Sequence, residues 1–530
     1  MYKQKLLEFS STAQKFVGDN FTKILTGLIL LIVIIATLKL QDRIVGWEGT
    51  YDAMQPQHHG KVSTLTLAII VRSTVENGFV GYATTLKDDQ NKIQYDYFDR
   101  YPVFFGVLFN AILSLSSKLS VKVIIAKQVM NVIFLATLVL AFLILDKLTR
   151  NKLLSLSAVL LAFSNPFLLF YKDMVHFDQP ALFGFLLVIY AIALYKLDGR
   201  KLPIFIATLV SIALGRGYAS YAILGLWLIF EAFLIFRSKT SGFGQKLKDL
   251  LRHPAFLLSI MGIIWGAGLL SYNIVIEART RNIPIMQTSI IDSAQRRLSL
   301  SPQFNEDAGS VIDWPSFTTT QINRIIQWAF PNSTVLGFGF LGNLLLLILM
   351  FVVMGIFLRG QPTEKRIVYL LLVLSGFAWL FPLRNLAAFH DYTTMYYIGI
   401  PMVLFLSVFT LLKPSTEVSH LLVIASLAIY FLAIAQVKDL HEAKDVNSSA
   451  YTYDFEQIQT KIDGTGKNIY MTDKIPYGPY AFQFYLKDDY LSPLKLADYV
   501  ISANPDYLPD NLTPDNQVMF LFKKPGTAAP

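Results

Sequence analysis

Long apolar runs recur along this chain of 530 residues and constrain its fold more than any other feature. Clear examples cover residues 24–40, 129–145, 181–195, 341–358 and 421–435. A run of about 20 apolar residues is long enough to cross a bilayer, where a helix satisfies its own backbone polar groups. Since 54% of the residues are hydrophobic and only 16% are charged, the pattern predicts a polytopic membrane protein and argues against a soluble fold.

Short clusters of Lys and Arg separate the apolar runs and indicate how the chain is threaded through the membrane. Basic residues concentrate in cytoplasmic loops, so the formal net charge of +9 indicates topology and not a nucleic-acid surface. With a cytoplasmic N-terminus, roughly eleven crossings are expected within an all-α membrane domain of residues 1–436. They lie near residues 24–40, 123–145, 153–171, 180–195, 202–215, 218–236, 255–276, 335–358, 367–383, 392–412 and 419–436. The first run lacks a small-residue cleavage site and should stay as an anchor.

Two long external loops, residues 41–122 and 277–334, follow from this threading. It also requires residues 101–115 to form an interfacial helix, because a crossing there would invert every later basic cluster. Within the first loop, residues 62–77 mix apolar and charged side chains in the pattern of another helix lying on the membrane.

The carboxyl tail, residues 437–530, is polar and carries more acidic residues than lysines. Alternating polar and apolar residues predict strands at 468–471, 498–501 and 517–522. Helix-like stretches at 455–462 and 479–486 complete the pattern of a small α/β domain outside the membrane.

Residues 176–180 (HFDQP) lie between two apolar runs and provide the strongest candidates for function. Ionisable residues flanked by hydrocarbon are rare and usually functional. Asp178 and His176 are therefore predicted to line a site. Even a purely structural role for Asp178 would require a buried or hydrated partner.

The start of the first external loop gathers acids and imidazoles: Glu48, Asp52, His58 and His59. One of them could act as a general base. The competing interpretation is that the acids are solvated loop residues and the histidines structural. A pair of histidines without further ligands is weak evidence for a metal, and the absence of cysteine excludes thiolate ligands and disulfides.

Further charged residues lie at predicted external turns: Asp99, Arg100, Arg216, Arg384 and His390. Arginine presents a fork of donors that suits phosphate. Alternatively, these arginines anchor the chain among lipid headgroups or pair with acids such as Asp391. The tyrosine-rich residues 392–397 are expected to form an interfacial aromatic belt.

Residues 98–103 (FDRYPV) and 178–182 (DQPAL) carry a resemblance to the C superfamily of glycosyltransferases. The branch containing protein O-mannosyltransferases and the lipid A aminoarabinose transferase is the most similar, over about residues 20–440. The family typically ends its first external loop with a Phe-Glu-Lys-Pro-Pro-Leu-like motif, from which Tyr101 departs, and opens its fourth span with an Asp-x-Pro-Leu-like motif. The resemblance implies that Arg100 contacts a carrier phosphate, while Asp99 and Asp178 line the site.

The position of the family's catalytic acid matches less well. The family places it early in the first loop, ahead of a surface helix that ends in glycine. Counting back from Gly78 reaches residues 58–64, which contain no acid. Either the loop is rearranged, with Asp52 or Glu48 as the acid, or imidazole replaces carboxylate; Asp52 is favoured.

The resemblance implies a plasma-membrane enzyme, the inner membrane in bacteria, with its active site and tail outside the cytoplasm. It would move a sugar, with inversion, from a polyprenyl-phosphate donor to a protein, lipid or glycan, with membrane lipids and no nucleic acid as other partners. The sequence establishes no cofactor and leaves a divalent metal as an option. Alternatives are a glycan polymerase or ligase with a lipid-pyrophosphate donor, a transporter or flippase, and a noncatalytic assembly or sensor protein.

Overall fold

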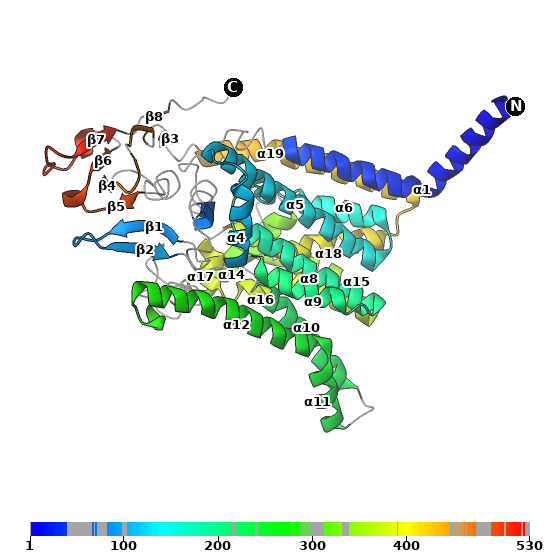
Figure 1. Ribbon diagram of the computed structural model, residues 1–530. Helices are drawn as coiled ribbons and strands as arrows, with labels where there is room; N and C mark the ends of the chain where they lie inside the picture. The colour runs from blue at the N-terminus through cyan, green and yellow to red at the C-terminus, as the bar shows by residue number, and fades with distance from the viewer. Residues whose placement is uncertain are drawn as a thin grey trace.

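A helical bundle with a β-sheet at one end is the architecture of the computed structural model (Figure 1). The structure describes residues 2–39, 66–67, 69–71, 82–97, 103–214, 219–238, 242–288, 291, 295, 312–330, 339–389, 391–445, 452–453, 458, 460–462, 464–472, 489–502, 505–520 and 523–524.

The described helices are α1 (Tyr2–Lys39), α4 (Val103–Leu113), α5 (Leu119–Thr149), α6 (Lys152–Phe163), α7 (Pro166–Phe170), α8 (Asp178–Asp198), α9 (Leu202–Ala213), α10 (Ala219–Arg237), α11 (Phe243–Arg252), α12 (Pro254–Arg281), α14 (Trp314–Ala329), α15 (Gly339–Arg359), α16 (Thr363–Leu380), α17 (Arg384–Phe389), α18 (Gly399–Leu412) and α19 (Thr416–Asp445). Short 3-10 helices include η1 (Ile285–Gln287), η4 (Asp391–Tyr397), η5 (Leu494–Leu496) and η6 (Pro505–Tyr507).

Within the described residues, 8 helices are long and apolar enough to cross a membrane. They belong to α1, α5, α8, α10, α12, α15, η4 with α18, and α19. The other expected spans are also helical, as α6 with α7, α9 and α16. The prediction of an all-α polytopic domain is therefore confirmed, with shorter apolar helices, α6 and α9, at two of the expected crossings.

The expected span 153–171 is divided into two helices at Asn165 and Pro166. Proline has no backbone N–H to continue a helix and disfavours helical geometry in the residue before it. The Asn165 side chain accepts a hydrogen bond from the Leu168 N–H at 3.2 Å and so begins α7. This break brings the chain out of the bundle just before the turn that leads to Asp178.

The short helix α4 is 11 residues long, or about 17 Å at 1.5 Å per residue. That length is too short to cross a bilayer core of about 30 Å, as expected for an interfacial helix. The other helix expected in this loop, residues 62–77, lies mostly outside the described residues.

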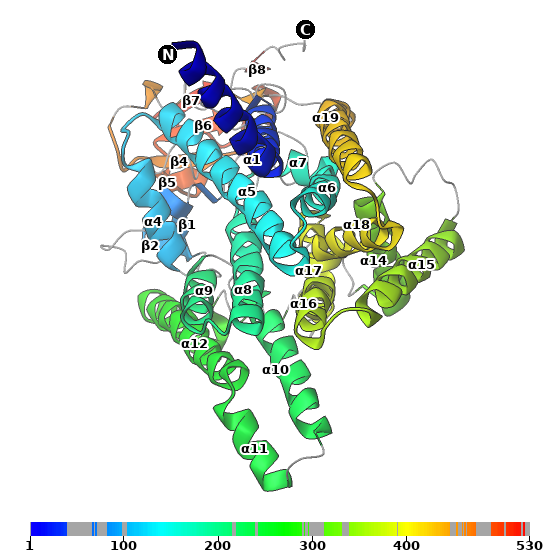
Figure 2. The same cartoon turned by 90° about the vertical axis from the view of Figure 1, so that its right-hand side faces the viewer.

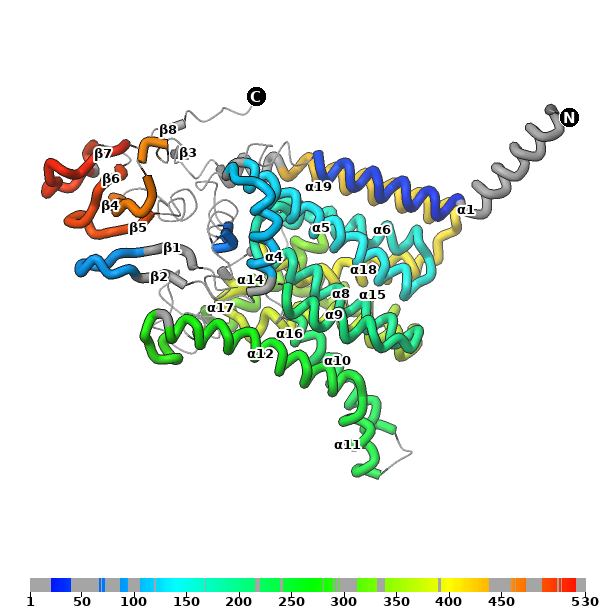
Figure 3. Tube along the Cα trace, in the orientation of Figure 1, coloured from blue at the N-terminus to red at the C-terminus, as the bar shows by residue number. Residues whose placement is uncertain are grey.

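Strands from the first loop and from the tail form a single sheet at one end of the bundle (Figure 3). Its order is β2-β1-β5-β4-β6-β7. These strands are β1 (Tyr82–Lys87), β2 (Ile93–Tyr97), β4 (Asn468–Met471), β5 (Tyr490–Leu491), β6 (Tyr499–Ser502) and β7 (Gln517–Phe520), while β3 (Thr452–Tyr453) and β8 (Lys523–Lys524) pair separately. The predicted small C-terminal α/β fold is confirmed, and β4, β6 and β7 match the three expected strands.

The junction between loop and tail is the parallel pairing of β1 with β5, in which Leu86 lies opposite Leu491. Side chains reinforce it: the Lys87 ammonium lies 4.4 Å from the Tyr490 ring centroid, and Lys495 Nζ lies 3.0 Å from Asp89 Oδ1. The sheet therefore includes part of the segment that sequence analysis assigns to the membrane domain.

A second hydrophobic cluster, separate from the main bundle core, connects the sheet to the bundle. It takes buried residues from the first loop, α4, α5, the turn before α8 and the tail. These include Leu67, Phe105, Met130, Phe177 and Ile501. The cluster packs the first loop against the residues that precede Asp178.

Basic residues meet at the end of the bundle opposite the sheet, which Figure 2 shows end-on. Lys147 Nζ, near the end of α5, lies 2.6 Å from Asp198 Oδ2, at the end of α8. This ion pair links the α5–α6 connection to the α8–α9 connection. Burial, and then the charge of Arg150, lower the pKa of Lys365 at the start of α16. Three expected basic clusters thus share one end of the molecule.

Candidate functional site

Asp178 is the first residue of α8, in the end of the bundle that faces the sheet, and its side chain is fully buried. The Tyr396 hydroxyl donates a hydrogen bond to Asp178 Oδ1 at 3.0 Å. On the other side, His176 Nδ1 lies 2.5 Å from Asp178 Oδ2. A buried carboxylate requires such partners because its desolvation is costly. The expectation that Asp178 has a buried partner is confirmed.

The turn that presents Asp178 is fixed by its own sequence. Gln179 Nε2 donates to the Tyr171 carbonyl at 3.4 Å, which closes the connection between α7 and α8. The Ala181 N–H donates to the Phe177 carbonyl at 3.1 Å and begins α8 there. An acid in the first turn also faces the positive end of the helix dipole.

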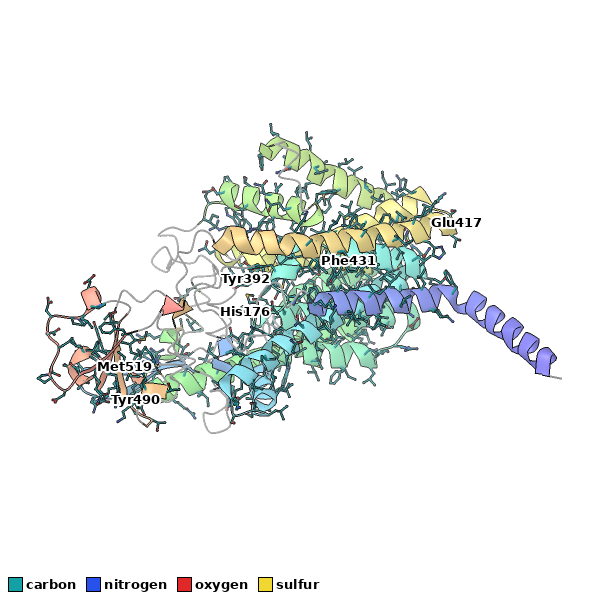
Figure 4. The ribbon with its side chains drawn as sticks, turned by 90° about the horizontal axis from the view of Figure 1, so that it is seen from above. His176, Tyr392, Glu417, Phe431, Tyr490 and Met519 are labelled. Carbon is teal, nitrogen blue, oxygen red and sulfur yellow. The ribbon has the colours of Figure 1, made fainter. Side chains whose placement is uncertain are left out.

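His176 lies among aromatic rings near Asp178. Its ring centroid is 5.3 Å from that of Tyr392 and 6.0 Å from that of Phe177. Figure 4 shows His176 and Tyr392 together at the bundle end nearest the sheet. The sequence prediction that His176 and Asp178 share a site is consistent with this geometry, while their functional roles stay predictions.

A buried lysine that the sequence analysis did not select lies in the same turn. Lys172 Nζ donates to Asn131 Oδ1 on α5 at 2.7 Å, and both side chains are fully buried. Burial lowers the pKa of Lys172, and the charge of Asp173 acts in the opposite direction. Lys127, one helical turn before Asn131, is also buried. Together with Asp178 these residues form a buried polar layer at this end of the bundle.

The tyrosines of η4 are part of this layer. Tyr392, Tyr396 and Tyr397 are 4%, 0% and 1% exposed, so the prediction of an interfacial belt is wrong for them. Buried tyrosines need a partner for the hydroxyl. Tyr396 finds it in Asp178, and Tyr397 donates to Gln321 Oε1 at 3.1 Å.

Arg384, the first residue of α17, lies over an aromatic ring. Its guanidinium carbon is 4.7 Å from the ring centroid of Trp314. Hydrogen bonds from the backbone and side chain of Ser316, with a smaller effect of Arg384, lower the pKa of Asp313. Arg384 begins a helix, α17, that contacts η4, and its role towards phosphate stays a prediction.

The other predicted site residues lie outside the described residues: Glu48, Asp52, His58, His59, Asp99, Arg100, Arg216 and His390. One described contact involves Phe105, which follows Asp99 and Arg100 closely in the sequence. The Phe105 ring packs edge-on against the Phe177 ring at a centroid distance of 5.6 Å.

No group of three or more His, Asp or Glu side chains that could hold a metal occurs in the described part of the chain. The histidines and acids of residues 48–59 are not included in that statement.

Comparison with solved structures gives the fold a precedent. ArnT from Cupriavidus metallidurans, in a crystal structure bound to undecaprenyl phosphate, aligns with a TM-score of 0.55 and 12% sequence identity, over 89% of this chain and 86% of that one. An Archaeoglobus fulgidus oligosaccharyltransferase, tethered to an acceptor peptide, aligns with a TM-score of 0.47 and 10% identity, over 91% and 65%. No protein-family model and no curated protein matches the sequence. The fold that the sequence resemblance implies is confirmed, because the chain shares the fold of this ArnT structure.

Proposed function

We propose that this protein is a membrane glycosyltransferase that moves a sugar from a polyprenyl-phosphate carrier to an acceptor hydroxyl or amine, with inversion. The fold shared with ArnT, whose structure contains undecaprenyl phosphate, supports a lipid-phosphate donor. The observation that carries the proposal is the Phe105–Phe177 contact. In the sequence, Phe105 follows Asp99 and Arg100 closely, and Phe177 lies between His176 and Asp178.

In the proposed reaction the acceptor attacks the anomeric carbon, whose bond to the phosphate oxygen breaks as the new bond forms. The acceptor loses a proton to a base, and the polyprenyl phosphate leaves with the electron pair. Asp52 is the preferred base, with Glu48, His58 and His59 as the alternatives in the same loop. A positioned base accelerates such a step by about 10²- to 10⁴-fold.

Charge on the leaving phosphate would be offset by guanidinium and imidazole groups. Arg100 is the first candidate, and Arg216, Arg384 and His390 are the others. Fixed donors aimed at developing charge are effective because they need no reorganisation during the reaction. Asp99, His176 and Asp178 would complete the polar lining of the site.

The proposed sidedness places this site outside the cytoplasm. It is supported by the basic clusters at the opposite end of the bundle, since such clusters favour the cytoplasmic side. The first loop and tail would then share the external face on which the donor sugar projects, and the tail would contribute to the choice of acceptor.

The test is transfer by the purified full-length protein in lipid nanodiscs, offered a panel of radiolabelled polyprenyl-phosphate and polyprenyl-pyrophosphate sugars. Most transfer activity is expected to be lost in the variants Asp178→Asn, Asp52→Asn and Arg100→Ala. The control variant Asp249→Asn changes an exposed acid on α11 and is expected to retain transfer. Equal transfer by all four variants would reject the assigned site. Transfer from pyrophosphate donors alone would support the polymerase or ligase alternative, and flipping of the donor without transfer would support a transporter.

A further inference from the structure

The helix α11 presents an apolar side that no described part of the protein covers. Phe243, Leu247 and Leu251 are 71%, 40% and 43% exposed. At about 100° of rotation per residue, these three side chains share one side of the helix. By the same rotation, Lys246 and Lys248 lie about 100° to either side of Leu247, and Arg252 lies about 140° from it, towards the opposite side.

The position of α11 requires it to stay close to a membrane surface. It connects α10 and α12, both of which are long and apolar enough to span a bilayer. Figures 1 and 2 show α11 extending sideways from the end of the bundle opposite the sheet, across the direction of α5 and α8. A helix in this position runs along the bilayer plane and not through it.

The lipid-facing surface of α10 continues directly onto the apolar side of α11. The Phe236 and Phe243 rings lie 5.7 Å apart, and Lys246 Nζ donates to the Phe236 carbonyl at 2.9 Å. One turn earlier on α10, Phe233 is 61% exposed. These contacts fix the start of α11 at the level where α10 leaves the hydrocarbon.

The other end of α11 is fixed by a buried ion cluster. The His253 N–H donates to the Leu250 carbonyl at 3.0 Å, and its imidazole Nδ1 accepts from the Ala255 N–H at 3.2 Å to begin α12. His253 Nε2 lies 3.7 Å from the Glu231 carboxylate, which Lys196 contacts at 2.7 Å. The α11 helix is therefore held at both ends with its apolar side outward.

We propose that α11 is an interfacial helix that binds anionic lipids. Its apolar side lies among the acyl chains of the leaflet opposite the sheet, and its basic residues bind lipid phosphate groups. Three basic residues against one acid, Asp249, give the helix a net positive charge. Amphipathic helices with this charge pattern bind bilayers by combined apolar burial and attraction to anionic headgroups.

The absence of cysteine from the whole chain permits a site-specific test in the full-length protein. Leu247→Cys on the apolar side and Gln245→Cys on the polar side would each carry an environment-sensitive fluorophore in nanodiscs. The probe at 247 is expected to be quenched by lipids with a spin label on the acyl chain, and the probe at 245 by aqueous iodide. Iodide quenching of equal strength at both positions would overturn the proposal. Protection of 247 from both quenchers would also overturn it, in favour of a protein partner.

The lipid preference is tested with the probe at 247 in two kinds of nanodisc, phosphatidylcholine alone and a mixture with phosphatidylglycerol. The fraction of docked helix is expected to be higher in the anionic mixture. In the anionic mixture, the double variant Lys248→Gln, Arg252→Gln should lower the docked-to-undocked ratio by about fivefold per charge removed. Added salt should also lower this ratio, because it screens the attraction to the headgroups. Equal docking in both lipids would reject the requirement for anionic headgroups. Proposed transferase activity is not needed for either readout.

Discussion

The Tyr396 hydroxyl and the Asp178 carboxylate are joined by a hydrogen bond of 3.0 Å across 218 residues of sequence. Asp178 begins α8, and Tyr396 lies in η4, just before α18. The bond therefore connects the first and second halves of the helical bundle at the end that faces the sheet. In the proposed enzyme it would fix the orientation of a carboxylate in the active site.

Tyr396→Phe is expected to weaken both stability and transfer. The substitution removes the hydrogen bond from the Tyr396 hydroxyl to Asp178 Oδ1, and the loss of a buried hydrogen bond to a charged group costs about 1–3 kcal/mol. Transfer should fall by about tenfold, equivalent to 1.36 kcal/mol of barrier. Thermal unfolding and initial transfer rates measure the two effects.

Tyr397→Phe is the matched control for this prediction. It removes a bond of similar length, 3.1 Å, to Gln321 but makes no contact with Asp178 among the described hydrogen bonds. A similar loss of stability with unchanged transfer is expected. Equal losses of transfer in both variants would indicate that Tyr396 acts only through the fold.

Gly376→Ala is expected to disturb the site from a neighbouring helix. A Cβ at Gly376 would lie 2.5 Å from the Tyr396 carbonyl oxygen, so α16 and η4 would have to separate. Overpacking of this kind costs about 1–3 kcal/mol and should lower transfer as Tyr396 moves. Gly355→Ala on α15 meets nothing within 4 Å and should be neutral or slightly stabilising. A neutral Gly376→Ala would contradict the close packing described for these helices.

The stability of the protein is expected to depend on pH through Lys172. Because burial lowers the pKa of Lys172 below its ordinary value of 10.5, the unfolded state binds more protons between the folded pKa and 10.5. Stability should therefore rise with pH across that window. Below it, the cost of burying the charged ammonium is fully present.

Lys172→Met removes this titration. The melting temperature of the wild type relative to Lys172→Met should rise as the pH approaches 10.5, and Lys92→Met, at an exposed lysine, controls for general effects of alkali. A constant difference between wild type and Lys172→Met at every pH would show that the ammonium is not desolvated.

A disulfide should form across the junction of loop and tail in Leu86→Cys with Leu491→Cys. These residues lie opposite each other in parallel strands, where Cα atoms are about 4.8 Å apart and within reach of a disulfide. Oxidation should produce a cross-linked species in non-reducing gels. The combination Leu86→Cys with Val518→Cys, which joins strands that are not neighbours in the sheet, should not. Equal cross-linking of both would reject the pairing.

Local sequence pattern is sufficient to predict the membrane helices and several strands of the tail, but not α11 or α14. Apolar runs identify membrane helices because the bilayer demands internally bonded backbone. Alternation over residues 468–471 and 499–501 likewise identified β4 and β6. By contrast, β1 and β2 were not predicted. Their sheet partner β5 lies near the other end of the sequence, and such a long-range pairing leaves no local periodic signal.

The candidate site likewise contains residues that the local sequence predicts and residues whose partners only the tertiary structure reveals. Asp178 could be predicted because an acid between apolar runs is conspicuous and demands a partner. Tyr396 could not be assigned as that partner, because tyrosine at a span's end is also typical of an interfacial belt. The burial of Lys172 could not be predicted from the sequence, since lysines beside a span usually face the headgroups. Its bond to Asn131 depends on how α5 packs against the turn, which tertiary structure alone decides.

The β1–β5 pairing also has a consequence for biosynthesis. The ribosome completes β1 early and β5 only after nearly every helix has entered the bilayer, so the outer edge of β1 waits unpaired during most of translation. An exposed strand edge invites pairing with other chains. The first loop therefore has to be shielded from other chains until the last part of the polypeptide has been made.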